Sequence, residues 1–266
     1  MFSMRGRVAL AAMLLAAASA AAADPSPICA DRPSKSTGPC TVPSGDWQVE
    51  IGLIDWTRDR SGGTRSDLIQ WGNTAVKYGL TDKADVELWV TPVETLGLRG
   101  GGAHEHLSSF GDTLVRVKYA LTEDDAPVQV ALDPFVKLPT ANHQLGNGKV
   151  EGGLLVPIAV PLGKGPLTLS LDPELDLLAD ADGHDRHAAM QQVVNLGLQA
   201  SDRLSLSAEL WGMWDWDPAG TTRQASADGA AAYLVTKDLQ IDAGANVGLN
   251  RVTPDIEIYT GVSLRF

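Results

Sequence analysis

Basic residues are scarce in this sequence, and none of them are clustered. The chain of 266 residues has 21 lysines and arginines against 33 aspartates and glutamates, which gives a formal net charge of −12 at pH 7. An acidic chain without a basic patch binds the phosphates of nucleic acids poorly. The composition therefore excludes DNA and RNA as partners.

Long hydrophobic runs are also missing beyond the first residues. A membrane-spanning helix needs roughly 20 consecutive apolar residues, and no such stretch follows residue 23. The first 23 residues combine the positive charges of Arg5 and Arg7, a short apolar run over 8–18 and a group of alanines before Asp24. This arrangement predicts a signal peptide, residues 1–23, that is removed on export.

Cysteine is rare, and both cysteines lie close together in a segment rich in proline and serine. Cys29 and Cys40 fall within 24–45, which we expect to be a periplasmic N-terminal segment. Export to an oxidising compartment favours a disulfide between them, with two free thiols as the alternative.

Alternation of apolar and polar residues is what the sequence does contain, and it recurs from residue 46 to 266. In the last run, DIEIYTGVSLRF, Ile256 and Ile258 share a face with Val262 and Leu264. A period of two predicts a strand with one apolar and one polar face. About twelve such runs are expected. They lie near 46–57, 66–80, 84–94, 110–121, 127–138, 150–162, 166–179, 188–199, 204–216, 227–236, 239–250 and 255–266.

A soluble β-sandwich also alternates, so other features must separate it from a membrane barrel. Short turns such as 80–83 and 163–165 alternate with longer glycine-rich segments such as 95–109 and 180–187, as in bacterial barrels. Tryptophans and tyrosines lie toward the ends of the runs, which is typical of interfacial girdles. We therefore predict an all-β fold, a transmembrane antiparallel up-and-down β-barrel of about 12 strands over 46–266. We place it in the bacterial outer membrane, against lipid, with both termini in the periplasm.

Three stretches resemble a known family. DWQVEIGLIDWT, NTAVKYGLTDKADVELWV and FGDTLVRVKYAL are similar to the outer-membrane transporter family associated with meta-pathway phenol degradation. The resemblance implies a small transporter-like barrel and supplies no catalytic residues. The final strand, which ends at Phe266, resembles the signal that the barrel-assembly machinery reads, so this machinery is an expected partner.

The polar faces of the runs carry most of the charged residues and predict the lining of the lumen. The candidates are Glu50, Asp85, Glu87, Asp112, Arg116, Lys118, Asp133, Lys137, Asp172, Glu174, Asp176, Glu209, Asp242, Asp255, Glu257 and Arg265. A water-filled lumen with this acidic excess would disfavour anions. We expect a channel or transporter for an unknown small solute. The alternative is a structural or adhesion barrel whose lumen is filled by side chains.

Features that would indicate an enzyme or a cofactor are weak. All five histidines fall in predicted loops, and only His104 with His106 and His184 with His187 offer ligands for a divalent metal at close spacing. Solvated loop residues are the simpler interpretation. A phospholipase-type barrel needs a histidine and a serine on an outward strand face, and no predicted strand carries a histidine. We therefore predict neither a cofactor nor catalysis.

Overall fold

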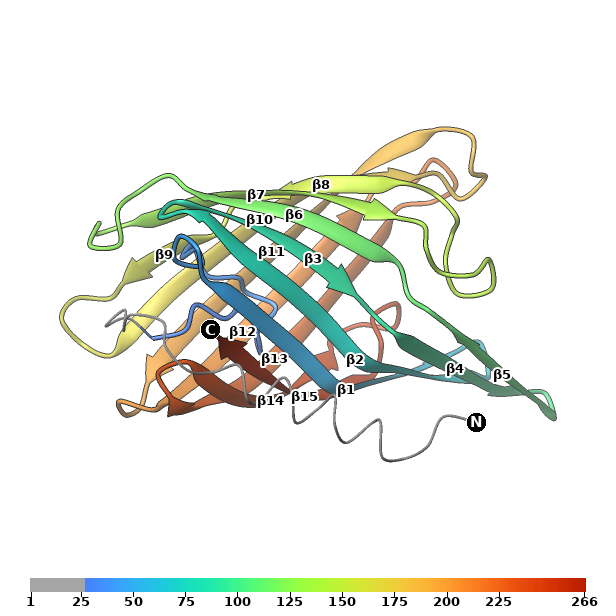
Figure 1. Ribbon diagram of the computed structural model, residues 1–266. Helices are drawn as coiled ribbons and strands as arrows, with labels where there is room; N and C mark the ends of the chain where they lie inside the picture. The colour runs from blue at the N-terminus through green and yellow to red at the C-terminus, as the bar shows by residue number, and fades with distance from the viewer. Residues whose placement is uncertain (1–26) are drawn as a thin grey trace, which may run out of the picture.

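The computed structural model describes residues 27–266, so the predicted signal peptide lies outside the described residues. No segment of residues 27–266 forms a helix with the length and hydrophobicity to cross a membrane. Fifteen strand segments make up the regular structure (Figure 1). They are β1 (Trp47–Ser61), β2 (Thr64–Thr81), β3 (Ala84–Val90), β4 (Val93–Gly100), β5 (Ala103–Ser109), β6 (Thr113–Ala120), β7 (Gln129–Leu138), β8 (Glu151–Leu155), β9 (Ile158–Pro161), β10 (Leu167–Ala179), β11 (Arg186–Gln199), β12 (Leu204–Asp215), β13 (Thr222–Thr236), β14 (Leu239–Gly248) and β15 (Ile256–Arg265).

The strands form one closed antiparallel barrel. Three pairs of segments, β3 with β4, β5 with β6 and β8 with β9, each form one interrupted strand, so twelve strands surround the lumen. The barrel closes where β1 pairs with β15, and the backbones of Trp47 and Phe266 bond reciprocally at 2.9 Å. Closure leaves no open edge along this seam, as a hydrocarbon environment requires. The predicted fold class and strand number are confirmed.

The two faces of the barrel wall have opposite polarity. On β3, Asp85 and Glu87 are buried toward the interior, while Leu88, on the outward face, is 44% exposed. On β6, Lys118 is buried, while Val115 and Val117 lie on the outside. A polar interior inside an apolar outer surface is the distribution of a barrel that faces lipid. This agrees with the predicted location in the outer membrane.

The connections differ from the prediction at one end of the barrel. Two long loops expected over 58–65 and 95–109 are wrong in extent, because the strands continue as hairpins closed by Gly62-Gly63 and Gly101-Gly102. Both glycines of each pair have positive φ, which suits the tight two-residue turn of a hairpin. Beyond the membrane the ladder hydrogen bonds persist, and the polar composition alone could not separate a hairpin from a loop.

The end of the barrel that carries the C-terminus also carries the tight turns 82–83 and 237–238. That this end faces the periplasm stays a prediction, which rests on the short turns that bacterial barrels place there. Phe266, the expected assembly signal, lies at this end beside Trp47. Its role in assembly stays a prediction.

Cysteine labelling of intact cells tests this orientation. Asp185→Cys lies in the connection 180–185, at the end of the barrel opposite the C-terminus, and should react with a membrane-impermeant maleimide. Lys164→Cys, in the turn 162–166, should react only after the outer membrane is opened. Both positions are exposed. The native cysteines give no background, because they are joined in a disulfide. If only Lys164→Cys is labelled in intact cells, the barrel has the opposite orientation to the one predicted.

Candidate functional site

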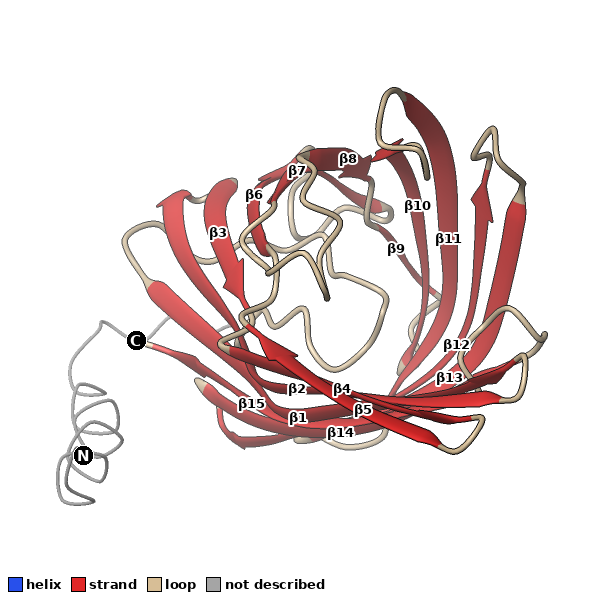
Figure 2. Cartoon of the chain, turned by 90° about the vertical axis from the view of Figure 1, so that its right-hand side faces the viewer, coloured by secondary structure: helices blue, strands red, loops and turns tan. Residues whose placement is uncertain are grey.

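The N-terminal segment folds back into the lumen. Residues 27–43, which we call the plug, begin beside the turn 237–238, where the Ile28 N–H donates to the Lys237 carbonyl at 2.8 Å. They end where the Val42 N–H donates to Asp85 and Ser44 bridges Gly79. The plug appears in blue among the strands in Figure 1, and Figure 2 shows non-strand segments inside the ring. We expected this stretch to precede the barrel in the periplasm; the buried polar groups of the wall hold it inside.

One end of the plug is held by a buried network of charges. The Asp31 carboxylate contacts the ammonium groups of Lys77 and Lys118, the latter at 2.5 Å. Glu50 accepts the Asp31 N–H at 3.1 Å and also lies 2.6 Å from the Lys77 ammonium. All four side chains are almost completely buried. The wall supplies Glu50 to Lys77, whereas the other carboxylate near Lys118, that of Glu87, lies 3.7 Å away. Since a buried charge without a partner is strongly destabilising, Asp31 of the plug is the close counter-ion of Lys118 and a second one for Lys77.

The wall is shaped to receive Arg32. Its guanidinium pairs with Asp242 at 3.0 Å and lies 6.0 Å from the ring of Tyr259. Beneath it, Gly52 and Gly261 face each other across the β1–β15 pair. A side chain at Gly261 would collide with the guanidinium, and one at Gly52 would come within 3.0 Å of it. The two glycines therefore make the space that the arginine occupies.

The other half of the plug contacts β10, β12 and β13. Lys35 pairs with Asp228 at 3.2 Å. Glu209 accepts the backbone N–H groups of Lys35 and Ser36, each at 3.1 Å, and the Ser36 hydroxyl donates to Asp172 at 2.7 Å. Acidic side chains of the wall thus satisfy both the charge and the backbone donors of the plug.

A disulfide joins Cys29 to Cys40, as predicted, with the Cα atoms 6.0 Å apart. The loop that it closes carries Asp31, Arg32 and Lys35, which pair with the wall. A closed loop has fewer conformations to lose when it docks, so the disulfide favours the docked plug.

A pocket lies between the plug and the end of the barrel opposite the C-terminus. Its volume is about 300 Å³, and its lining includes the side chains of Trp89, Leu114 and Arg116. The Arg116 guanidinium stands 5.3 Å from the Trp89 ring. Leu145 of the connection 139–150 also lines the pocket, and this connection is fixed by an N–H of Ala141 that donates to Asp112 at 3.0 Å. The mixture of aromatic, aliphatic and charged groups is typical of a small-molecule site.

The structure places the predicted lumen candidates in three groups. Most are buried: Glu50, Asp85, Glu87, Lys118, Asp133, Asp172, Asp176, Glu209, Asp242 and Arg265. Five are partly exposed: Asp112, Arg116, Lys137, Glu174 and Glu257. Asp255, which lies just before β15, is exposed and pairs with Arg60. Sequence reasoning missed the plug residues Asp31, Arg32, Lys35 and Ser36; the large excess of acidic candidates was the one sign that further cations were needed.

The histidines differ from the prediction that none lies in a strand. His104 and His106 belong to β5, and His187 belongs to β11. His187 contacts Asp180 at 2.8 Å and Asp215 at 2.7 Å, one through each ring nitrogen, while His184 is an exposed loop residue. Over residues 27–266 no set of three histidines, cysteines or acidic residues is arranged to hold a metal ion.

Hydrogen bonds also order the extracellular rim near His187. The backbone N–H groups of Ala219 and Ala181 donate to the Asp217 carboxylate at 2.6 and 2.8 Å. The bond from Ala219 contributes most to holding the pKa of Asp217 below its ordinary value. Asp217 therefore joins the connections 180–185 and 216–221 at the mouth.

Comparisons with known proteins agree with this architecture. A family model described as "Putative MetA-pathway of phenol degradation" matches residues 30–266. The crystal structure of the COG4313 outer membrane channel from Pseudomonas putida F1 is 14% identical; the match covers 88% of this chain and 100% of that chain, with a TM-score of 0.72. The β domain of the Bordetella autotransporter Brka is 10% identical over 85% of this chain and 100% of its own, with a TM-score of 0.52. No curated protein matches the sequence.

Proposed function

The chain belongs to the phenol-degradation family whose model matches it from residue 30 to its last residue, and we propose that it is an outer-membrane channel for small solutes. The observation that carries this proposal is the construction of the lumen. A polar wall encloses the plug, which polar contacts hold in place, and pockets lie on both sides of it. A barrel with a purely structural role has no need of an inserted segment that leaves space on either side.

The plug sets the width of the passage in this proposal. Its contacts with the wall are ion pairs and hydrogen bonds rather than an apolar core, as those of Arg32 with Asp242 and Lys35 with Asp228 illustrate. Polar contacts of this kind can be replaced by water when the plug shifts, at a lower cost than the exposure of apolar surface. The wall can therefore keep its fold while the plug moves.

Charge in the lumen defines the class of solute. Several carboxylates are buried in the wall in addition to those that bind the plug. Asp133 and Glu87 lie near Arg116 and Lys118, at 3.4 and 3.7 Å, whereas Asp176 forms no ion pair within residues 27–266. The acidic residues of the lumen still outnumber the basic ones. Rings of acidic side chains favour cations and oppose anions. We propose that neutral and cationic small molecules pass, and that anions are rejected. The similar channel from Pseudomonas putida F1 is consistent with passage as the function, without naming the solute.

Planar-bilayer recording on the refolded full-length protein tests this function. We expect small conductance steps and a reversal potential, in a potassium chloride gradient, that indicates a preference for potassium. A second measurement, the swelling of protein-loaded liposomes in small neutral sugars, extends the test to uncharged solutes. Liposomes with heat-denatured protein are the control. If neither conductance nor swelling exceeds this control, the structural or adhesion barrel is the better description.

A further inference from the structure

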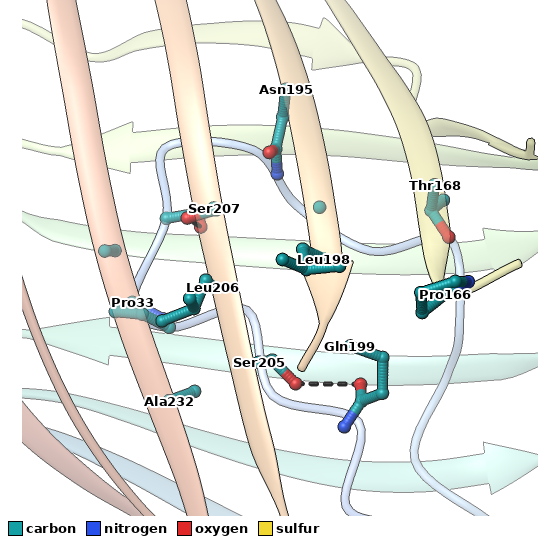
Figure 3. A pocket seen from close by; sticks show the side chains of 13 residues that line it. Pro33, Pro166, Thr168, Asn195, Leu198, Gln199, Ser205, Leu206, Ser207 and Ala232 are labelled. Carbon is teal, nitrogen blue, oxygen red and sulfur yellow. Dashed lines mark hydrogen bonds between the residues drawn. The ribbon is translucent and has the colours of Figure 1, made fainter. Parts of the chain in front are cut away.

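A second pocket lies on the periplasmic side of the plug, between the plug and strands β10 to β13. Its volume is about 210 Å³. Pro33 and Ser34 of the plug form one side, and the inward faces of the strands form the other (Figure 3). Pro166 and Gln199 at its edge are exposed, which places its opening at the periplasmic end. This pocket is smaller than the sites that bind drug-sized ligands, so it suits a compact molecule.

The lining of this pocket is uncharged, unlike the rest of the lumen. The wall contributes hydroxyl groups, including those of Thr168 and Ser207, and small apolar groups, including the methyls of Ala230 and Ala232. No aspartate, glutamate, lysine or arginine lines it. A charged solute would therefore lose water here without gaining an ionic partner, whereas a neutral solute would not pay this cost.

One polar atom in the pocket has no partner. Asn195 is only 9% exposed, and its Oδ1 accepts no hydrogen bond from any residue between 27 and 266. Four of the other polar side chains around the pocket are paired: Ser34 with Ser207 at 2.9 Å, and Ser205 with Gln199 at 2.9 Å. Figure 3 shows the Asn195 amide among the lining side chains, with its head group toward the level of Ser207. Since buried acceptors in folded proteins are normally satisfied, this oxygen is available to a donor from a ligand.

We propose that this pocket binds a small uncharged alcohol, whose hydroxyl donates to Asn195 Oδ1 while its hydrocarbon body packs against Pro33, Ala230 and Ala232. The proposal rests on the proposed function, because it makes the pocket the last site at which a solute binds before it enters the periplasm. It also specifies that function, since it names the chemical group that the exit side recognises.

The test uses cyclohexanol and cyclohexanone as probes of nearly equal size, of which only the alcohol has a donor. Full-length protein is labelled with carbon-13 at alanine methyls, refolded in detergent and titrated by NMR. We expect saturable shifts of the Ala230 and Ala232 methyl signals with cyclohexanol. Cyclohexanone should bind about tenfold more weakly, the factor expected from one lost hydrogen bond. Equal affinities for the two probes, or no saturable shift with cyclohexanol, would overturn the proposal.

Two variants and one control make the assignment specific. Asn195→Leu removes the acceptor at similar volume and should weaken cyclohexanol binding about tenfold, as read at both alanines. Ala230→Leu fills the pocket from β13 and should abolish the saturable shift of Ala232. Asn73→Leu, which makes the same exchange in the other pocket, should leave the binding unchanged. Wild-type affinity in both pocket variants would contradict the site. Conductance and liposome swelling are recorded on the same preparations. A protein that conducts or swells liposomes but shows no shifts refutes the pocket alone, and shifts without either conductance or swelling refute the channel alone.

Discussion

Asp31→Ala is expected to release the plug and raise the single-channel conductance several-fold. The substitution removes the carboxylate that lies between the buried ammonium groups of Lys77 and Lys118. Removing one partner from a buried ion pair costs roughly 3–5 kcal/mol. Glu50 still pairs with Lys77 at 2.6 Å, so the cost falls mainly on Lys118, whose other carboxylate, Glu87, lies 3.7 Å away. The molecule can avoid this cost by letting the plug leave, because water then reaches both lysines. The docked state should therefore lose most of its population, while the barrel keeps its fold.

The measurement compares wild-type and variant channels in planar bilayers, together with limited proteolysis of residues 27–43 from the periplasmic side. Thr41→Ala is the matched control. It removes one neutral hydrogen bond, to the Asp82 carbonyl, from the same segment and should change conductance little. A variant with wild-type conductance and a protected plug would show that the Asp31 network does not control the passage.

Leu210→Arg should lower the unfolding free energy by roughly 2–4 kcal/mol, the cost of arginine on the lipid face at the middle of a barrel. Leu210 lies at the centre of β12, and its side chain is 59% exposed on the outer surface. Asn246→Arg adds the same charge on the inward face of β14, where Glu257 accepts from the Asn246 amide at 2.6 Å. The new arginine would there gain an acidic partner, so this variant should be much less destabilised.

Urea titration of the protein folded into liposomes, followed by tryptophan fluorescence, gives both free energies. Val247→Arg is a control for the depth of the new charge in the membrane. It also faces outward, at 48% exposure, but lies next to the extracellular end of β14, so its cost should be smaller than that of Leu210→Arg. Greater damage from Asn246→Arg than from Leu210→Arg would mean that the two faces of the wall are reversed.

The sequence predicted the wall better than its contents. Alternation placed Asp85, Glu87 and Lys118 on inward faces and Val117 on an outward one, and burial in the structure matches this division. For Asp255, which lies just before β15 and is exposed, the predicted place in the lumen stays a prediction. At a strand end the backbone leaves the ladder, and the period of two no longer specifies a side.

The sequence by itself determined the strand number, the closed antiparallel barrel and the polarity of its two faces. These properties follow from local regularities, since each strand shows its period and each turn its composition over a few neighbouring residues. Only the tertiary structure decided where residues 27–43 lie and that pockets remain on both sides of them. Asp31 meets Lys118 across 87 positions of the chain, and Arg32 meets Asp242 across 210. Contacts at such separations leave no periodic trace in the sequence. They arise because a closed polar wall holds buried charges, such as those of Lys118 and Asp242, that take their close partners from the inserted segment.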